Sequence, residues 1–380
     1  MTSAQEMLQE RMKLFNDAMN FRKPKRTPMI ANTFTWKIFD SDLNVKLSEA
    51  TSDWDIMEKV MCEHHERYQF DAYLDYGTRN VNKLNNILGG LQHQINDETG
   101  AINAVDHVLM EGDEYDEYLA NPTMFLWTKV APRKFGELTI GQIQEAIIEL
   151  GKFRAYDAKI KGIFQNKYGI PEVYKNYCQL PIETLFTGYR GIKEFSIDMR
   201  KRPNKIKDFV QASEPGFLAY VDKLLELPNT HYVCDLYSAF LAHSIMSVKQ
   251  FEELYWPTYK KVIDRLTAQG KTTYLFCEAE FLRIADFFQD VPKGTIILHV
   301  ENDNIFEVRK KVPNICLAGG MPVDLLGKST PQKCVDYAKM LIDEMGEGFV
   351  FSQNKMMSYK NDATRENMLA VNEFVRNYSG

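Results

Sequence analysis

The sequence lacks the features that mark several common classes of protein. None of its apolar runs approaches the roughly 18 residues needed to cross a bilayer. Its formal net charge of −6 leaves no basic surplus for binding nucleic-acid phosphates. The six cysteines show no CxxC spacing, and neither a glycine-rich dinucleotide fingerprint nor a Walker loop is present. We therefore expect no membrane insertion, no nucleic-acid partner and no disulfide framework.

The first residues predict a helix and not a leader sequence. Residues 1–21 are amphipathic, contain several Glu and Lys, and place Met, Leu and Phe on one stripe. Scattered, reduced thiols are typical of the cytosol. We expect a cytoplasmic protein with an N-terminal helical extension at residues 1–25 and a single domain at residues 26–380.

The most informative stretch is residues 271–304, which predicts strand, helix, strand. The apolar run TTYLF ends at Cys277-Glu278, and the run TIIL ends at His299-Val300-Glu301. Two such runs joined by a helical crossover form a parallel βαβ unit. Strands and helices alternate throughout the second half of the chain, which favours an α/β fold, specifically a closed (β/α)₈ TIM barrel. We also expect a β excursion at residues 88–110 and a strand within residues 182–191.

The C-terminal end of each predicted strand carries residue types that bind metals or transfer protons. Glu278 and His299 are separated by 21 positions, about one βαβ repeat, so neighbouring strands would place them at the same mouth. Barrel chemistry occurs where strands end. The alternative is that each side chain is a cap or an ion-pair partner.

Several segments together suggest a family. Residues 110–135 (MEGDEYDEYLANPTMFLWTKVAPRKF), 247–264 (SVKQFEELYWPTYKKVID), 315–343 (ICLAGGMPVDLLGKSTPQKCVDYAKMLID) and 365–378 (RENMLAVNEFVRNY) carry the similarity. They resemble the uroporphyrinogen decarboxylase superfamily. That resemblance implies a (β/α)₈ barrel with its site at the C-terminal strand ends.

The superfamily divides by chemistry, and the resemblance favours one branch. The decarboxylase has an arginine-containing signature where this chain has RTPMIANTFTWKIFDSD, without those arginines. Thiol methyltransferases hold zinc through H-x-C and a later Cys, and Leu275 and Asn354 or Lys355 occupy two of those positions here. The chain is more similar to the methyltransferase component of aryl methyl ether O-demethylases.

That resemblance implies a zinc site in which Glu278 and His299 are the leading ligands. Cys277, Glu301 and Cys316 are further candidates, and Asp264 lies near the expected place of an upstream acidic ligand. An oxygen and nitrogen ligand set would suit activation of an ether oxygen. Asp235, after the run YVC, is a candidate acid/base, and His243 is a structural or functional candidate. Four aromatic residues in expected loops would line a substrate pocket, namely Phe34, Trp36, Tyr237 and Phe240.

The leading hypothesis is therefore a corrinoid-dependent methyltransferase. It would take a methyl group from a small methylated substrate, such as a methoxy-aromatic, and pass it to the cobalt of a separate corrinoid protein. The alternatives are transfer from methylcorrinoid to a thiol or pterin, a decarboxylase-like lyase, and a non-catalytic barrel that binds a corrinoid or tetrapyrrole. A homodimer is compatible with all of them.

Overall fold

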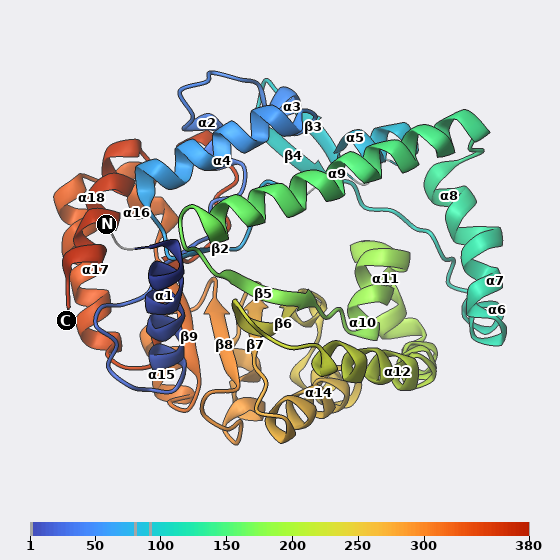
Figure 1. The fold of residues 1–380 in the computed structure, drawn as a ribbon. Coiled ribbons are helices and arrows are strands. Elements are labelled where there is room, and N and C mark those ends of the chain that lie inside the picture. The colour runs from blue at the N-terminus through green and yellow to red at the C-terminus, as the bar shows by residue number, and fades with distance from the viewer. Residues whose placement is uncertain (1–2, 80–81, 91–92, 380) are drawn as a thin grey trace.

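Eight parallel strands form the centre of the protein (Figure 1). The computed structural model describes residues 3–79, 82–90 and 93–379. The strands follow one another around the sheet in chain order: β1 (Ile30–Ala31), β2 (Ala72–Tyr73), β5 (Glu172–Tyr177), β6 (Tyr232–Phe240), β7 (Thr273–Cys277), β8 (Ile296–Val300), β9 (Cys316–Met321) and β10 (Phe349–Gln353). A parallel bridge from Met29 to Phe351 joins the first strand to the last. The predicted TIM barrel is confirmed.

Side-chain alternation along the strands builds two apolar layers. Tyr274, Phe276 and Ile297 belong to a cluster inside the barrel, whereas Leu275 and Leu298 pack outward against the helices. Strands buried on both faces read as continuous apolar runs, which is why β7 to β10 were predictable from sequence.

Helices surround the barrel (Figure 1). The long ones are α1 (Ala4–Met19), α4 (Trp54–Tyr68), α9 (Ile140–Asn166), α11 (Gly191–Lys201), α12 (Pro203–Glu226), α14 (Trp256–Ala268), α17 (Pro331–Met345) and α18 (Arg365–Asn377). Short α-helices are α2 (Trp36–Phe39), α3 (Leu47–Ala50), α5 (Asn82–Ile87), α6 (Tyr115–Ala120), α7 (Pro122–Phe125), α8 (Ala131–Phe135), α10 (Pro181–Glu183), α13 (Val248–Gln250), α15 (Ile305–Lys311) and α16 (Val323–Lys328).

Six further segments are 3₁₀ or π turns. The π segments are η1 (Leu126–Val130), η2 (Thr184–Arg190) and η4 (Phe251–Tyr255), and the 3₁₀ segments are η3 (Ala242–Ile245), η5 (Leu282–Phe288) and η6 (Lys360–Asp362). The segment η4 directly precedes α14, in which Pro257 occupies the first turn. The sequence of residues 248–269 predicts a helix that is interrupted at Trp256-Pro257, and the structure has this interruption.

A long excursion separates β2 from β5. It contains α5, an antiparallel hairpin of β3 (His93–Asn96) and β4 (Ala101–Ala104), helices α6 to α8, and α9. The expected β excursion is therefore present, although Leu91 and Gln92 of its first predicted strand lie outside the described residues. The C-terminal end of α9 leads directly into β5.

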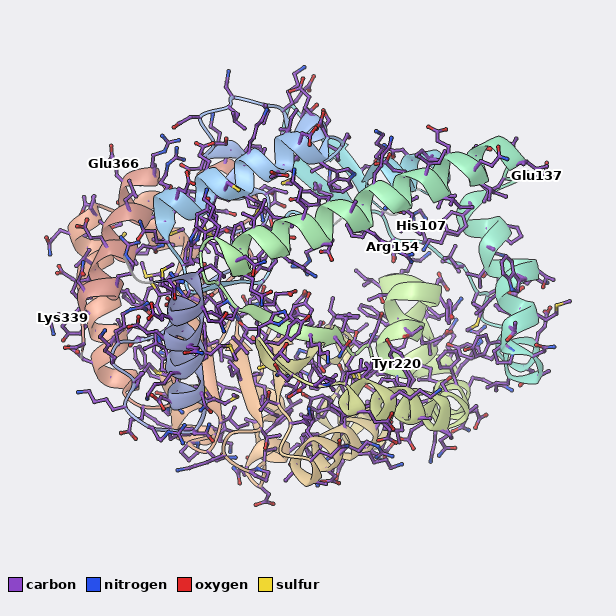
Figure 2. The ribbon with its side chains drawn as sticks, in the orientation of Figure 1. His107, Glu137, Arg154, Tyr220, Lys339 and Glu366 are labelled. Atoms are coloured by element: carbon purple, nitrogen blue, oxygen red, sulfur yellow. The ribbon has the colours of Figure 1, made fainter. Side chains whose placement is uncertain are left out.

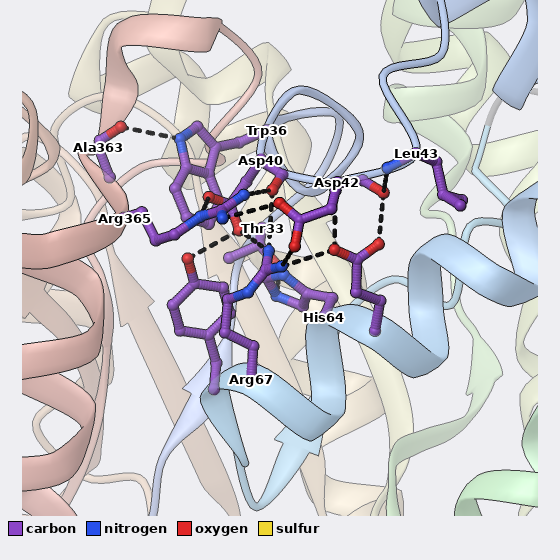
Figure 3. A network of polar contacts seen from close by, with 12 residues as sticks. Thr33, Trp36, Asp40, Asp42, Leu43, His64, Arg67, Ala363 and Arg365 are labelled. Carbon is purple, nitrogen blue, oxygen red and sulfur yellow. Dashed lines mark hydrogen bonds and ion pairs between the residues drawn. The ribbon is translucent and has the colours of Figure 1, made fainter.

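An ion-pair network ties the segment after β1 to α4 and α18 (Figure 3). Asp40 accepts hydrogen bonds from Arg67, Tyr68 and Arg365. The indole N–H of Trp36 donates to the carbonyl of Ala363 at 3.1 Å. Because these groups come from both ends of the chain, they hold the barrel closed where β1 meets β10.

The outer surface is largely charged. Figure 2 shows Glu137, Lys339 and Glu366 projecting from the periphery, and all three are exposed. Among the described residues, no helix is both long enough and apolar enough to cross a membrane.

Three local predictions need correction. The strand expected within residues 182–191 is the helical pair α10 and η2, and the real strand β5 lies earlier, at Glu172–Tyr177. The extended run TPMIANTFTW (residues 27–36) predicts a first strand of ten residues, but only Ile30 and Ala31 form β1. The crossover after β7 is the 3₁₀ segment η5 and not an α-helix.

Candidate active site

A cavity of about 330 Å³ lies at the C-terminal ends of the strands. Its walls come from the exits of β1 and β2 and from residues of β5, β6 and β7: Asn32, Leu74, Asp75, Thr78, Arg79, Tyr174, Tyr177, Tyr237 and Phe276. This is the end of a TIM barrel at which active sites are built. A cavity of this size accommodates one small ligand.

Three tyrosines form one aromatic wall. The ring of Tyr237 lies 4.6 Å from that of Tyr174 and 5.7 Å from that of Tyr177, centroid to centroid. Burial raises the pKa of all three hydroxyls, that of Tyr177 to about 12. They are therefore neutral hydrogen-bond donors at physiological pH. Tyr237 was predicted to line the pocket, and the structure places it there.

Glu278 follows directly after β7, beyond the inward-facing Phe276. Burial and, as the smaller cause, the nearby charge of Glu301 raise the pKa of its carboxyl group to about 7, while the charge of Arg79 opposes the shift. Its backbone N–H donates to the carbonyl of Phe240 at 3.1 Å. A carboxyl group with this pKa exchanges a proton near neutrality, as a general acid or base requires.

The turn after Glu278 is unusual. Ala279 has φ of 60°, a left-handed conformation that costs a residue with a side chain roughly 1 kcal/mol or more. Its N–H donates to a carboxylate oxygen of Glu301 at 2.7 Å. This turn ends β7 sharply and brings Glu278 and Glu301 to the same side of the barrel.

His299 lies inside the barrel with both ring nitrogens engaged. Its Nε2 is 3.1 Å from the carbonyl oxygen of Asn354, and its Nδ1 is 2.7 Å from the hydroxyl of Tyr274. A carbonyl only accepts, so Nε2 carries the proton and Nδ1 accepts from Tyr274. Burial lowers the pKa of His299 to about 4, and the neutral ring stacks on Phe276. No lone pair remains for a metal in this arrangement.

The two cysteines predicted as metal ligands do not lie beside the carboxylates of Glu278 and Glu301. Cys277 faces the outer core, with its sulfur 3.4 Å from Nε2 of His243. Cys316 is buried inside the barrel, and burial raises its pKa to about 12. Among the residues that the structure describes, no three His, Cys, Asp or Glu side chains are grouped as a metal site. The residues as placed do not fit zinc: Glu278 and Glu301 lie near enough for their charges to interact, but both ring nitrogens of the expected ligand His299 are occupied.

Other predicted site residues lie away from the cavity. Asp235 is the fourth residue of β6, which continues to Phe240, so it faces the N-terminal end of the barrel. There its carboxylate accepts from Lys271 and from the N–H of Thr272. Its assignment as catalytic is therefore corrected to a structural ion pair. Asp264 lies on α14 and pairs with Lys260.

The predicted pocket residues divide between cavity and core. Phe34 lies beneath the guanidinium of Arg79, 5.7 Å from its ring centre. Trp36 is buried against His64 and Tyr68, and Phe240 packs outward on Tyr255 and Tyr259. The last two are core residues and do not line the cavity.

His243 supports Glu278 from behind. Its Nε2–H donates to the carbonyl oxygen of Glu278 at 2.7 Å, and burial lowers its pKa to about 4. It is a positioning residue for the β7 exit.

Sequence reasoning missed Glu183, Arg79, Tyr174 and Tyr177. Glu183 is buried, accepts from the N–H groups of Leu241 and Ala242 and from Tyr255, and burial raises its pKa to about 7. The signal for Arg79 was its place just after the predicted strand DAYLDYG. The tyrosines belong to β5, a strand that was not predicted.

Comparison with known proteins fixes the family. The model of the uroporphyrinogen decarboxylase (URO-D) family matches residues 184–378, just over half of the chain. The chain belongs to the uroporphyrinogen decarboxylase family. Among solved structures it is similar to a methyltransferase from Methanosarcina mazei, with a TM-score of 0.63, 14% identity and 99% of each chain covered. No curated protein matches the sequence.

At that level of identity the solved structure shows a shared fold. The site suits a small molecule that has an apolar ring and a few polar groups.

Proposed function

We propose that this protein is a methyltransferase that demethylates a small methoxy-aromatic substrate and transfers the methyl group to the cobalt of a separate corrinoid protein. The observation that carries the proposal is Glu278, a carboxyl group with a pKa of about 7 that lies two residues after the cavity-lining Phe276 and interacts with the charge of the cavity-lining Arg79. The methyltransferase with the same fold and the sequence resemblance to O-demethylases support it.

The chemistry requires a proton at the leaving oxygen. In the proposed reaction the reduced cobalt of the partner attacks the methyl carbon, a carbon–cobalt bond forms, and the carbon–oxygen bond breaks. The oxygen keeps the bonding electron pair and takes the proton of Glu278, which later regains one from solvent. A protonated acid at this position lowers the barrier by avoiding a free phenolate.

The aromatic wall would orient the substrate. Tyr174, Tyr177 and Tyr237 offer flat apolar faces with neutral hydroxyl donors, which suits a planar ring with polar substituents. Phe276 completes the wall beside Glu278. Fixing the ring would hold the methoxy group at the acid and leave its methyl carbon open to the partner.

The proposal is tested by methylation of a reduced corrinoid protein with a panel of methoxy-aromatics. We expect Glu278→Gln to lower the rate about 100-fold or more, because the amide cannot supply the proton. Glu280→Gln, which alters an exposed carboxylate two residues away, should retain the wild-type rate. Equal rates for wild type and Glu278→Gln would contradict the role of Glu278.

The zinc ion expected from the sequence is a separate prediction, and the mechanism above has no step through it. Binding through His299 would require the ring to leave both Tyr274 and Asn354. Elemental analysis of wild type, Glu278→Gln and His299→Ala decides the matter. One zinc per chain that is lost in both variants would support the predicted site and would show that the ring moves.

A small-molecule decarboxylase is the second candidate. The family and the placement of Arg79 and Glu278 favour it, since an arginine can hold a carboxylate and an acid can protonate the carbon that remains. Release of CO₂ without methylation of the corrinoid would identify this activity.

A further inference from the structure

Arg79 is a cation that lacks an ion-pair partner among the described residues. It lines the cavity, and the sulfur of Met356, 2.7 Å from Nη1, is its side-chain hydrogen-bond partner. Sulfur is a weak acceptor, so most of the guanidinium N–H donors remain open to a ligand. The charge is exposed to the cavity and is not part of the outer surface network.

The carboxylate of Asp75, four residues before Arg79, already has other partners. Asp75 pairs with the buried ammonium group of Lys37 and accepts from the backbone N–H groups of Thr78 and Arg79. These bonds fix the loop that carries Arg79 and use the carboxylate of Asp75. The loop that carries Arg79 is therefore fixed, while no carboxylate of the described residues forms an ion pair with the guanidinium.

The other side chains around the cavity determine which ligand groups would lie next to Arg79. The three tyrosines and Phe276 give flat apolar walls, and Phe34 lies under the guanidinium. Glu278 is the acidic group beyond Phe276, on the β7 side. A ligand in the cavity would meet the cation and the aromatic rings, with the carboxyl group of Glu278 near enough for its charge to interact with Arg79.

We propose that Arg79 binds a carboxylate of the substrate, so that the methyl donor is a methoxylated aromatic carboxylate. This rests on the proposed function and names its substrate class. The planar fork of a guanidinium matches a carboxylate in a bidentate geometry. A cationic methylated amine without a carboxylate is disfavoured by the same charge.

Binding measured by titration calorimetry tests this without any methyl transfer. The ligands are 4-methoxybenzoate, benzoate, neutral methoxybenzene and trimethylglycine. We expect 4-methoxybenzoate and benzoate to bind, with Kd raised about 100-fold by Arg79→Gln, because this change removes the charge-assisted bonds to the carboxylate. Arg154→Gln removes an exposed arginine of α9 (Figure 2) and should leave Kd unchanged.

Arg79→Lys keeps the positive charge but lacks the planar guanidinium that binds a carboxylate through two hydrogen bonds. It should therefore weaken binding less than Arg79→Gln, and it also serves as a control for folding. Equal Kd values in wild type, Arg79→Gln and Arg79→Lys would overturn the inference. So would methoxybenzene binding as tightly as 4-methoxybenzoate, or trimethylglycine as the only ligand whose binding depends on Arg79.

The two proposals fail separately. Arg79-dependent binding of 4-methoxybenzoate without methylation of a corrinoid protein would retain the carboxylate site and reject the methyltransferase. Methylation from neutral methoxy-aromatics alone would retain the methyltransferase and reject the carboxylate site.

Discussion

At the scale of single residues, the function depends on how burial changes the acidity of Glu278. An exposed glutamate is ionised at neutral pH and would be a poor acid. Burial, with Glu301 nearby, raises the pKa from 4.5 to about 7. The same carboxyl group therefore carries a proton in an appreciable fraction of molecules at physiological pH.

This shift predicts a pH dependence of stability. Because the folded pKa lies above the unfolded value, the folded state binds more protons between pH 4.5 and about 7. Stability is thus fully present below pH 4.5 and is lost as the pH rises through 7. Glu278→Gln removes this loss, so we expect it to stabilise the protein at about pH 8, by about 3 kcal/mol at most, and much less at about pH 5. Urea denaturation at the two pH values measures the difference.

A Glu278→Gln variant that is equally stabilising at both pH values would contradict the assigned pKa. Glu280→Gln is the matched control, and we expect it to change stability little at either pH because its side chain is exposed.

Sequence reasoning found Glu278 because a charged residue directly after an apolar strand is visible in the sequence. It misplaced Asp235 for a related reason. The run YVC was taken as a whole strand, but β6 continues to Phe240 and carries Asp235 near its start. The hydrogen bonds that occupy His299 come from Tyr274 and Asn354, the latter 55 positions away in sequence. Such a contact is invisible before the barrel is formed.

At the scale of elements, strands that are buried on both faces were predictable from the sequence. A strand that combines apolar and polar residues was not. β7 to β10 are mostly apolar, whereas β5 (EVYKNY) mixes polar residues with the two tyrosines that line the cavity. The run within residues 182–191 looked like a strand, yet its residues form α10 and η2, whose apolar side chains fill the core beside β6. Tertiary packing decided between the two structures.

The close approach of β8 and β9 gives a prediction for Gly319. This residue has φ of +108°, and a Cβ would lie 2.8 Å from the carbonyl oxygen of Val300. We expect Gly319→Ala to destabilise the protein by about 2 kcal/mol or more, from backbone strain and contact with a rigid strand. Thermal unfolding measures the change.

Gly151→Ala is the opposite control. Gly151 lies within α9, and a Cβ there would meet no atom within 4 Å. Because alanine favours a helix over glycine, this change should stabilise by about 0.5–1 kcal/mol. Equal effects of the two substitutions would contradict the close packing of β8 and β9.

At the scale of the whole molecule, α9 extends beyond the barrel on the side of the cavity. It has 27 residues, about 40 Å, whereas β5 has six, about 20 Å. Since the C-terminal end of α9 leads into the start of β5, its N-terminal half projects past the mouth. Ile140, Ile143, Ile147 and Ile148 are exposed on that half.

A partner that delivers cobalt to the mouth would contact this apolar face. We expect Ile147→Asp to raise the KM for the corrinoid protein about tenfold while leaving the Kd of 4-methoxybenzoate unchanged. Met340→Asp on α17, across the molecule in Figure 1, is the control and should change neither quantity. If Ile147→Asp instead dissociates a homodimer and leaves KM unchanged, the face binds a second copy of the chain.

The central claim is that the chain transfers a methyl group from an ether oxygen to cobalt. The most direct measurement uses trideuteromethyl ethers, 4-methoxybenzoate and methoxybenzene in parallel, with the protein and a reduced corrinoid protein. The account predicts trideuteromethyl-cobalt and the corresponding phenol in equal amounts by mass spectrometry, with formation slowed by Glu278→Gln. Recovery of unchanged ethers, or of CO₂ with the methoxy group intact, would contradict it.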